Sequence, residues 1–227
     1  MTSRCRFSLY RFNPVGLIIL IFLSLFSYSS LNKTIDLRAI SCKNDSLIST
    51  PIINIDKLNP IVYQEALQGL ATYSKTYQLN HKLIAIVDFD LPSTQKRLFI
   101  IDIETNKLIH SSLVAHGSGS GFNLAQQFSN INGSHQSSIG FFKTSETYIG
   151  KHGLSLRLDG LDKGVNDKAR ERNIVIHGAD YVSEAFIKKN NRLGRSWGCP
   201  ALPIKDYNKV LDYLDDEIIL FIHATGK

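Results

Sequence analysis

A cysteine and a histidine in the C-terminal third of the sequence have the residue types and the settings for nucleophilic acyl transfer. Cys199 lies between Gly198 and Pro200 in the segment Gly-Arg-Ser-Trp-Gly-Cys-Pro. Because glycine has no Cβ, the backbone there can turn tightly and a substrate carbonyl can approach the thiol. A backbone N–H of Gly198 or Cys199 would then point at the oxygen that becomes negative during the attack. A nearby cation, Arg195, favours ionisation of the thiol.

His177 is the best candidate for the base that activates this thiol. It follows the apolar run 174–176 and precedes Gly178, so its ring is expected at the end of a strand with a fixed backbone. An exposed thiolate beside a histidine is the arrangement that a cysteine acyltransferase uses. Since a single histidine is more often structural than catalytic, the spacing alone leaves the pair a hypothesis.

Three further histidines flank polar segments of the chain. Residues 117–138 are rich in Gly, Ser and Asn, and this composition predicts a loop over a functional site. His116, His135 and His152 could join His177 and Cys199 as zinc ligands, because zinc accepts nitrogen and sulfur. No pair of them has a recognised short ligand spacing, so we expect no metal site. His116 and His152 are instead predicted to line the substrate pocket.

The elements that must position these residues are mostly strands. An amphipathic helix is predicted to begin at Asn59-Pro60, with Asn as cap and Pro in the first turn, and to end near Gln78. Strands are predicted over 83–89, 97–103, 108–115, 139–144, 173–177 and 218–223. Short helices are predicted over 182–190 and 205–214. The fold class is therefore mainly β, a mixed sheet or sandwich with a few peripheral helices, and its first three strands form an antiparallel meander.

The N-terminal 29 residues have the pattern of an export signal. Three arginines and no acidic residue accompany the apolar run 15–26, and small residues such as Ser27 and Ser29 follow it. An uncleaved membrane anchor is the alternative, because the run extends to about Leu31, near the lower limit for a spanning helix. The protein would contact the inner membrane only if this anchor is not cleaved. Either way the folded part is expected in the periplasm or cell envelope.

The charge of the chain excludes one class of partner. The 227 residues carry a formal net charge of +6. Three of the basic residues lie in the N-terminal segment, and the remainder holds 23 basic against 20 acidic residues. No run of basic residues forms a stripe, so the sequence does not predict nucleic-acid binding.

Two long segments resemble a known family. Ile-Val-Ile-His-Gly-Ala-Asp-Tyr-Val-Ser (174–183) and Gly-Arg-Ser-Trp-Gly-Cys-Pro-Ala (194–201) resemble the L,D-transpeptidase catalytic domain with the YkuD-type fold, in its divergent branch with Ser-Trp-Gly-Cys-Pro. Shorter pieces at 115–117, 128–130, 137–140 and 150–153 are also similar to that branch. The resemblance spans about 83–227. It divides the chain into a signal peptide or anchor (1–29), a lead-in segment and helix (30–80) and a catalytic domain (81–227).

The resemblance implies roles for individual residues. It implies that Cys199 is the nucleophile, that His177 is the base, and that the carbonyl of Gly178 orients the imidazole. Ser196 and Gly198 match positions that shape the turn and help form the oxyanion hole.

Two positions depart from the family pattern. Trp197 occupies a place where the wider family commonly has His or Arg, and we expect it to form a platform for substrate. Ala201 occupies the place of a usual Arg or Asn, so a carboxylate-binding cation is missing there. Arg195 is predicted to replace that cation.

The activity implied by the resemblance is remodelling of peptidoglycan stem peptides without a metal or organic cofactor. The thiolate would attack the carbonyl of the third residue of a tetrapeptide stem and expel the terminal D-Ala. Transfer to an amine gives a 3→3 cross-link. An L,D-carboxypeptidase or amidase would use the same residues with another acceptor. A non-catalytic, exported wall-binding protein with a Cys42–Cys199 disulfide is the alternative of another class.

Overall fold

The computed structural model describes residues 58–214 and 217–226. The predicted export signal, most of the lead-in segment and Cys42 lie outside the described residues. The helices are α2 (Pro60–Tyr73), α3 (Glu184–Asn190) and α4 (Ile204–Leu214). The strands are β1 (Leu83–Asp88), β2 (Leu98–Asp102), β3 (Lys107–Ser112), β4 (Gly140–Gly150), β5 (Gly153–Gly160), β6 (Val175–Ala179), β7 (Ala201–Pro203) and β8 (Ile219–His223). Within the described residues, no helix is long and apolar enough to cross a membrane.

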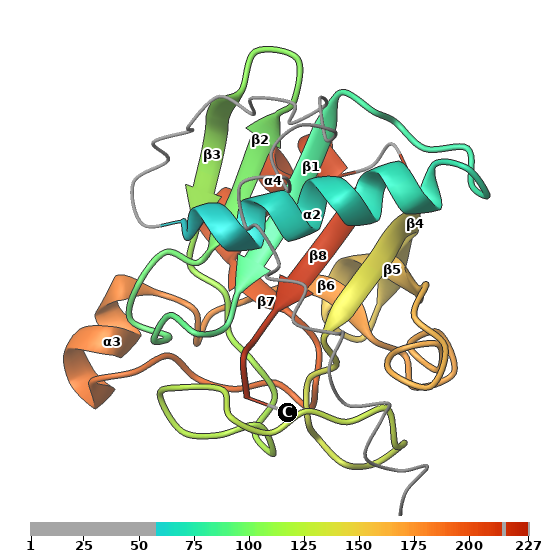
Figure 1. Cartoon of the computed structure of the whole chain (residues 1–227). Coiled ribbons are helices and arrows are strands. Elements are labelled where there is room, and N and C mark those ends of the chain that lie inside the picture. The colour runs from blue at the N-terminus through green and yellow to red at the C-terminus, as the bar shows by residue number, and fades with distance from the viewer. Residues whose placement is uncertain (1–57, 215–216, 227) are drawn as a thin grey trace, which may run out of the picture. The chain divides into compact units, whose positions relative to one another are not determined.

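The eight strands form one mixed sheet in the order β3-β2-β1-β8-β4-β5-β6-β7 (Figure 1). The antiparallel meander of β1, β2 and β3 is confirmed. Strand β8 pairs in parallel with β1, and β7 pairs in parallel with β6, while the other neighbours are antiparallel. The expectation of a mainly β fold with peripheral helices is therefore confirmed, as a single sheet instead of a sandwich.

Helix α2 covers one face of the sheet (Figure 1). The side chain of Asn59 caps it by accepting a hydrogen bond from the N–H of Ile61 at 2.9 Å, and Pro60 occupies the first turn as predicted. The helix ends at Tyr73, five residues before the predicted end, and Ser74 caps it, with its hydroxyl donating to the carbonyl of Leu70 at 2.6 Å. The periodic position Tyr77 thus lies beyond the helix.

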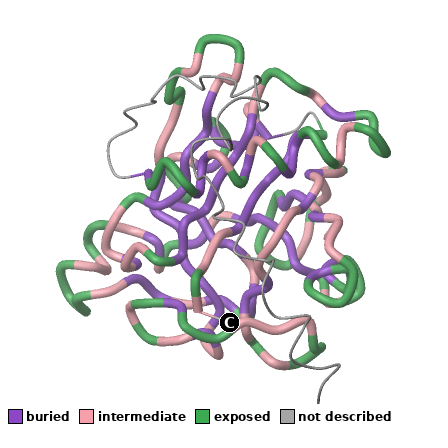
Figure 2. The backbone as a smooth tube through the Cα atoms, viewed as in Figure 1, coloured by how far each residue is buried: buried purple, intermediate pink, exposed green. Residues whose placement is uncertain are grey.

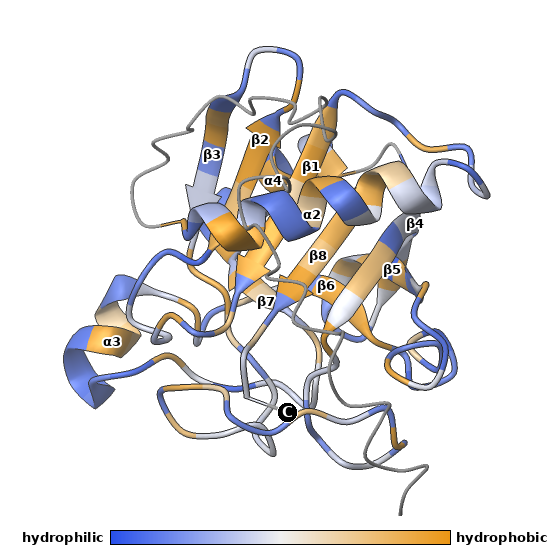
Figure 3. Cartoon of the chain, viewed as in Figure 1, coloured by the Kyte–Doolittle hydropathy of each residue, from blue (hydrophilic) through white to orange (hydrophobic). Residues whose placement is uncertain are grey.

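Helix α4 packs on the opposite face of the sheet. Alternate residues of β1 enter different cores, since Ile84 and Ile86 contact the α2 side while Ala85 and Val87 belong to the core of α4. The apolar residues that α4 contributes are Tyr207, Val210, Leu211 and Leu214. The central strands are accordingly buried and apolar along their length (Figures 2 and 3).

Two strands were not predicted. Strand β5 forms a hairpin with β4, which is itself longer than the predicted 139–144. Strand β7 has only three residues and directly follows the cysteine turn. Its parallel pairing with β6 brings the segments that carry Cys199 and His177 side by side.

Candidate active site

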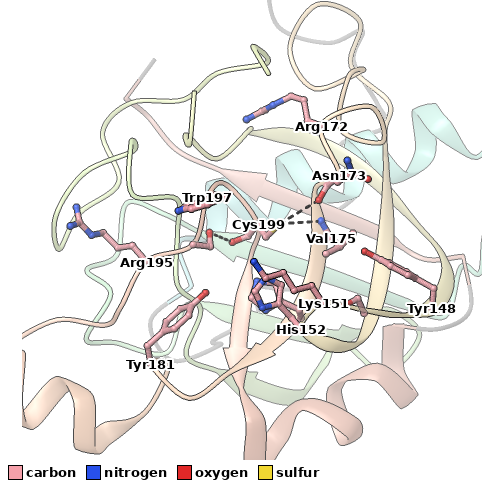
Figure 4. Close-up of a pocket in the computed structure, with 13 residues that line it drawn as sticks. Tyr148, Lys151, His152, Arg172, Asn173, Val175, Tyr181, Arg195, Trp197 and Cys199 are labelled. Atoms are coloured by element: carbon pink, nitrogen blue, oxygen red, sulfur yellow. Dashed lines mark hydrogen bonds between the residues drawn. The ribbon is translucent and has the colours of Figure 1, made fainter. Parts of the chain in front are cut away.

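The β6–β7 pair positions both predicted catalytic residues. His177 of β6 is in register with Ala201 of β7, and Cys199 lies two residues before that partner. Both side chains line one cavity of about 380 Å³ at the end of these strands (Figure 4). The structure therefore gathers the nucleophile and the base that the sequence predicted, from segments 22 positions apart.

Cys199 is a free, partly buried thiol. Its Sγ lies 3.5 Å from the N–H of Val175, which donates to it, and 3.5 Å from the carbonyl of Asn173, to which the thiol donates. Burial raises the pKa of Cys199, and the N–H of Val175 and the cation of Arg172 oppose this shift. The predicted help from Arg195 is thus corrected, because Arg172 is the arginine that acts on the thiol.

His177 is held in the tautomer that a base needs. Its Nδ1 lies 3.0 Å from the carbonyl oxygen of Gly178. Because a carbonyl only accepts, Nδ1 carries the proton and Nε2 is left with a free lone pair. The ring is buried, and burial lowers the pKa of His177, with a smaller opposing contribution from the Gly178 carbonyl. His177 is therefore neutral near pH 7 and ready to accept a proton.

No hydrogen bond joins the thiol to this ring in the described part of the chain. Such catalytic contacts are often long in a free enzyme and tighten when substrate binds. The ring of His152, from the turn between β4 and β5, stacks on His177 with centroids 4.5 Å apart. His152 is exposed and lines the cavity, as predicted.

The turn before the nucleophile is fixed by Ser196 and Gly198. The Ser196 hydroxyl donates to the carbonyl of Cys199 at 2.6 Å and accepts from the N–H of Gly198 at 3.1 Å. Gly198 has a φ of 123°, and a Cβ there would lie 2.8 Å from the carbonyl oxygen of Gln136. Since its N–H is already bonded to Ser196, the N–H of Cys199 is the better oxyanion donor of the two that we predicted.

The loop 117–138 is hydrogen-bonded to this turn, and it is less exposed than its polar composition suggested. The buried Ser137 accepts from the N–H of Gly117 at 2.9 Å and donates to the carbonyl of Gly198 at 3.0 Å. The N–H of Ser118 donates to the carbonyl of Ser196 at 2.8 Å. The serines of the loop therefore form buried hydrogen bonds next to the turn of Cys199, which explains how so polar a segment can be packed inside.

Arg195 lines the cavity, but its guanidinium is turned toward the loop (Figure 4). Its Nη1 donates to the carbonyls of Gly121 at 2.9 Å and Ser118 at 3.3 Å, and the group lies over the ring of Phe122. These contacts argue against the predicted role of Arg195 in binding a substrate carboxylate. Through these contacts Arg195 holds the loop 117–138 in its conformation.

Trp197 and His116 differ in their access to the cavity. Trp197 lines it, is 74% exposed, and stacks on His135 with centroids 4.9 Å apart, an arrangement compatible with the predicted platform. His116 is 1% exposed and absent from the cavity wall. Its Nδ1 lies 2.8 Å from a guanidinium nitrogen of Arg97, and burial beside that cation lowers the pKa of His116 to about 3. The substrate contact predicted for His116 is therefore corrected to a buried structural one.

Several cavity residues were missed from the sequence, among them Arg172, Lys151 and Tyr181. Arg172 donates to the hydroxyl of Ser138 at 2.5 Å and to the carbonyl of Gln136 at 2.8 Å, so it ties the loop to the segment before β6. The sequence held one signal for these missed residues, because Lys151 lies in the Gly-Lys-His-Gly piece (150–153) that resembles the family.

Comparisons with known proteins give one strong match. A family model described as the L,D-transpeptidase catalytic domain matches residues 54–223, three quarters of the chain, and the match begins before α2. No curated protein sequence matches.

The solved structures to which this chain is similar include L,D-transpeptidases. That from Mycobacterium smegmatis has 10% identity and a TM-score of 0.38, covering 63% of this chain and 59% of its own. That from Stackebrandtia nassauensis has 17% identity and a TM-score of 0.38, covering 77% and 75%. Mycobacterium tuberculosis L,D-transpeptidase 1 has 12% identity and a TM-score of 0.35, covering 63% and 62%. The chain thus spans about three fifths of the length of the first of these structures.

Proposed function

The chain belongs to the L,D-transpeptidase catalytic-domain family, and we propose that it cross-links peptidoglycan by acyl transfer, with Cys199 as nucleophile and His177 as base. One observation carries this proposal. The thiol and an imidazole whose Nδ1 is bonded to the Gly178 carbonyl line the same cavity. That geometry leaves Nε2 free to take the thiol proton, which is what a cysteine nucleophile requires.

The first half of the reaction acylates the enzyme. As substrate binds, Nε2 of His177 accepts the proton from Sγ, and the thiolate attacks the carbonyl carbon of the third residue of a tetrapeptide stem. The N–H of Cys199 stabilises the oxyanion. When the intermediate collapses, the amide C–N bond breaks, and His177 returns the proton to the departing amine of D-Ala.

The second half transfers the acyl group. An amine of a neighbouring stem loses its proton to His177 and attacks the thioester, so the C–S bond breaks and a 3→3 cross-link forms. Water in place of the amine would give a tripeptide, which is the carboxypeptidase alternative. The open cavity and the exposed Trp197 beside the thiol favour a peptide acceptor, because they offer it surface to bind.

The proposal includes export of the enzyme to the periplasm or cell envelope, supported by the basic and apolar pattern of residues 1–29. No observation favours the alternative with a Cys42–Cys199 disulfide. Cys42 itself lies outside the described residues.

Muropeptide analysis tests this function. The purified protein is incubated with tetrapeptide muropeptides, and the products are identified by mass spectrometry. We expect 3→3 dimers with the wild type and with Cys42→Ala, and none with Cys199→Ala. Tripeptides without dimers would replace cross-linking by hydrolysis, and unchanged muropeptides would contradict the enzymatic proposal.

A further inference from the structure

The cavity lacks a cation at the position where the family usually has one, and the structure offers a replacement on a different element. We propose that Lys151, in the turn of the β4–β5 hairpin, binds a carboxylate of the stem peptide next to the scissile amide. This inference rests on the proposed function and names the residue that selects its substrate.

The arginines of the cavity wall are already bonded to the protein. Arg195 donates to loop carbonyls and lies over Phe122. Arg172 uses both terminal nitrogens on the loop, one on Ser138 and the other on Gln136. These bonds orient both guanidinium groups toward the loop, through Nη1 of Arg195 and through both terminal nitrogens of Arg172.

Lys151 is the remaining permanent cation of the cavity wall. It is exposed and has no hydrogen bond or ion pair with any residue that the structure describes. Lys151 lines the cavity, and in the view of Figure 4 its side chain lies in front of His152 with the ammonium end toward Cys199. An ammonium group with three free donors therefore faces the space that a bound stem peptide would occupy.

The hairpin holds this lysine in place. The neighbouring ring of His152 stacks on the buried base His177 at 4.5 Å, which fixes the turn against the cavity. The guanidinium of Arg157 lies 4.2 Å from the ring centroid of Tyr148 at the end of β4. His177 and Lys151 are thus linked through one residue, so the backbone of Lys151 has a defined position relative to the imidazole, and its side chain can reach the cavity.

The acidic residues of the hairpin do not compete for Lys151. Glu146 pairs with Arg170 at 2.7 Å and with Arg157 at 3.2 Å. Asp159 pairs with Arg170 at 2.5 Å. With both carboxylates neutralised elsewhere, an incoming anion is the natural partner of the ammonium.

The chemistry of the stem supplies such an anion in two places. The leaving D-Ala ends in a carboxylate one residue beyond the attacked carbonyl, and a diamino acid at the third position presents a second carboxylate. Either one lies close to the scissile bond and can pair with an ammonium beside Cys199. Lysine acts there as a point charge, so it tolerates either geometry better than a bidentate guanidinium does.

The test combines the wild type and three variants with three peptides. Lys151→Gln removes the charge and keeps the length, Lys151→Arg keeps the charge, and Lys163→Ala removes an exposed lysine that is absent from the cavity wall. The peptides are a tetrapeptide stem with free carboxylates, its C-terminal carboxamide, and the form with the diamino-acid carboxylate amidated. For each combination kcat/KM is measured.

We expect Lys151→Gln to lower kcat/KM for the free acid by about 10- to 100-fold, the range for hydrogen bonds to a charged group. Lys151→Arg should keep most of the rate, and Lys163→Ala all of it. One of the amidated peptides should react as slowly with wild type as with Lys151→Gln, and its identity tells which carboxylate is bound. An equal loss on all three peptides, or no loss on the free acid, would overturn the inference.

A second measurement separates this inference from the proposed function. Alkylation of Cys199 by neutral iodoacetamide should proceed at the same rate in Lys151→Gln and wild type, since the nucleophile and the base are intact. Normal alkylation with unchanged peptide kinetics in Lys151→Gln refutes the lysine's role while leaving the proposed function standing. Full cross-linking by Cys199→Ala would instead refute the proposed function.

Discussion

The two walls of the cavity are built in opposite ways. The wall that carries Cys199 is held by buried hydrogen bonds between backbone groups and the serines of the loop 117–138, such as Ser137. The wall formed by the β4–β5 hairpin rests on an antiparallel backbone ladder, and its side-chain contacts are ring stacking and ion pairs of exposed groups, as at His152 and Arg170. Cys199 thus lies on a wall fixed by buried polar contacts, and Lys151 lies on a wall whose side-chain contacts are exposed.

The energies of the two kinds of contact explain this division. A buried polar group that loses its partner costs about 1–3 kcal/mol, whereas an exposed ion pair contributes about 0–1 kcal/mol. An oxyanion donor such as the N–H of Cys199 must be fixed within fractions of an ångström. The buried hydrogen bonds of the loop serines hold the turn that carries it.

The largest effect is expected at His177, which contacts the hairpin through His152 and lines the cavity together with Cys199. Replacing His177 by Gln removes the proton acceptor but keeps an N–H for the carbonyl of Gly178, so kcat/KM should fall by about 10²–10⁴-fold. Because the side chain is buried, the melting temperature should be recorded beside the kinetics. A variant that keeps its fold and its full rate would remove His177 from the mechanism.

Two serine-to-alanine variants, one in each wall, compare how much each wall contributes to stability. Ser137→Ala leaves the N–H of Gly117 and the carbonyl of Gly198 without their partner, so the free energy of unfolding should fall by about 1–3 kcal/mol. Ser145→Ala on the hairpin removes only partly exposed bonds and should change it by less than about 0.5 kcal/mol. Urea denaturation measures both. Equal losses would contradict the difference between the walls.

The hairpin variant His152→Ala should change the pH profile more than the stability. The base must be neutral to act, and burial lowers the pKa of His177, so activity is kept on acidification below the usual histidine range. Removing His152 exposes His177 and raises its pKa, which shifts the acidic limb of kcat/KM to higher pH. The loss at pH 7 should be a few-fold. An unshifted acidic limb would show that the stacking does not affect the base.

The smallest effect on substrate selectivity is expected for Arg195→Ala. Because its guanidinium bonds to loop carbonyls, the free energy of unfolding should fall by about 0.5–1.5 kcal/mol. The ratio of kcat/KM between the free and the C-terminally amidated stem should stay unchanged. A collapse of that ratio would restore Arg195 as the carboxylate anchor and displace Lys151.

The sequence predicted those parts that depend on local patterns. The start of α2 followed from Asn59-Pro60, and the meander followed from apolar runs separated by turns. Strand β7 is too short to leave a pattern. Strand β5 did carry a signal, since Leu154, Leu156 and Leu158 alternate with polar residues.

The site was predictable where one short segment defines it and not where distant segments meet. Cys199 and His177 lie in motifs that can be read along the chain. The roles of Arg172 and Lys151 depend on which loop or strand each one faces after folding, which no local pattern encodes. His116 was misjudged because its burial is decided by Arg97, a partner 19 residues away in sequence.

The central claim is that Cys199 forms the acyl-enzyme, and intact-mass spectrometry tests it most directly. The protein is mixed with a carbapenem, whose strained β-lactam carbonyl mimics the scissile amide, and digested for peptide mapping after the intact mass is recorded. The account predicts one drug adduct per chain, mapped to Cys199, present in Cys42→Ala and absent in Cys199→Ala. An adduct that persists in Cys199→Ala, or a wild-type protein that stays unmodified, would contradict it.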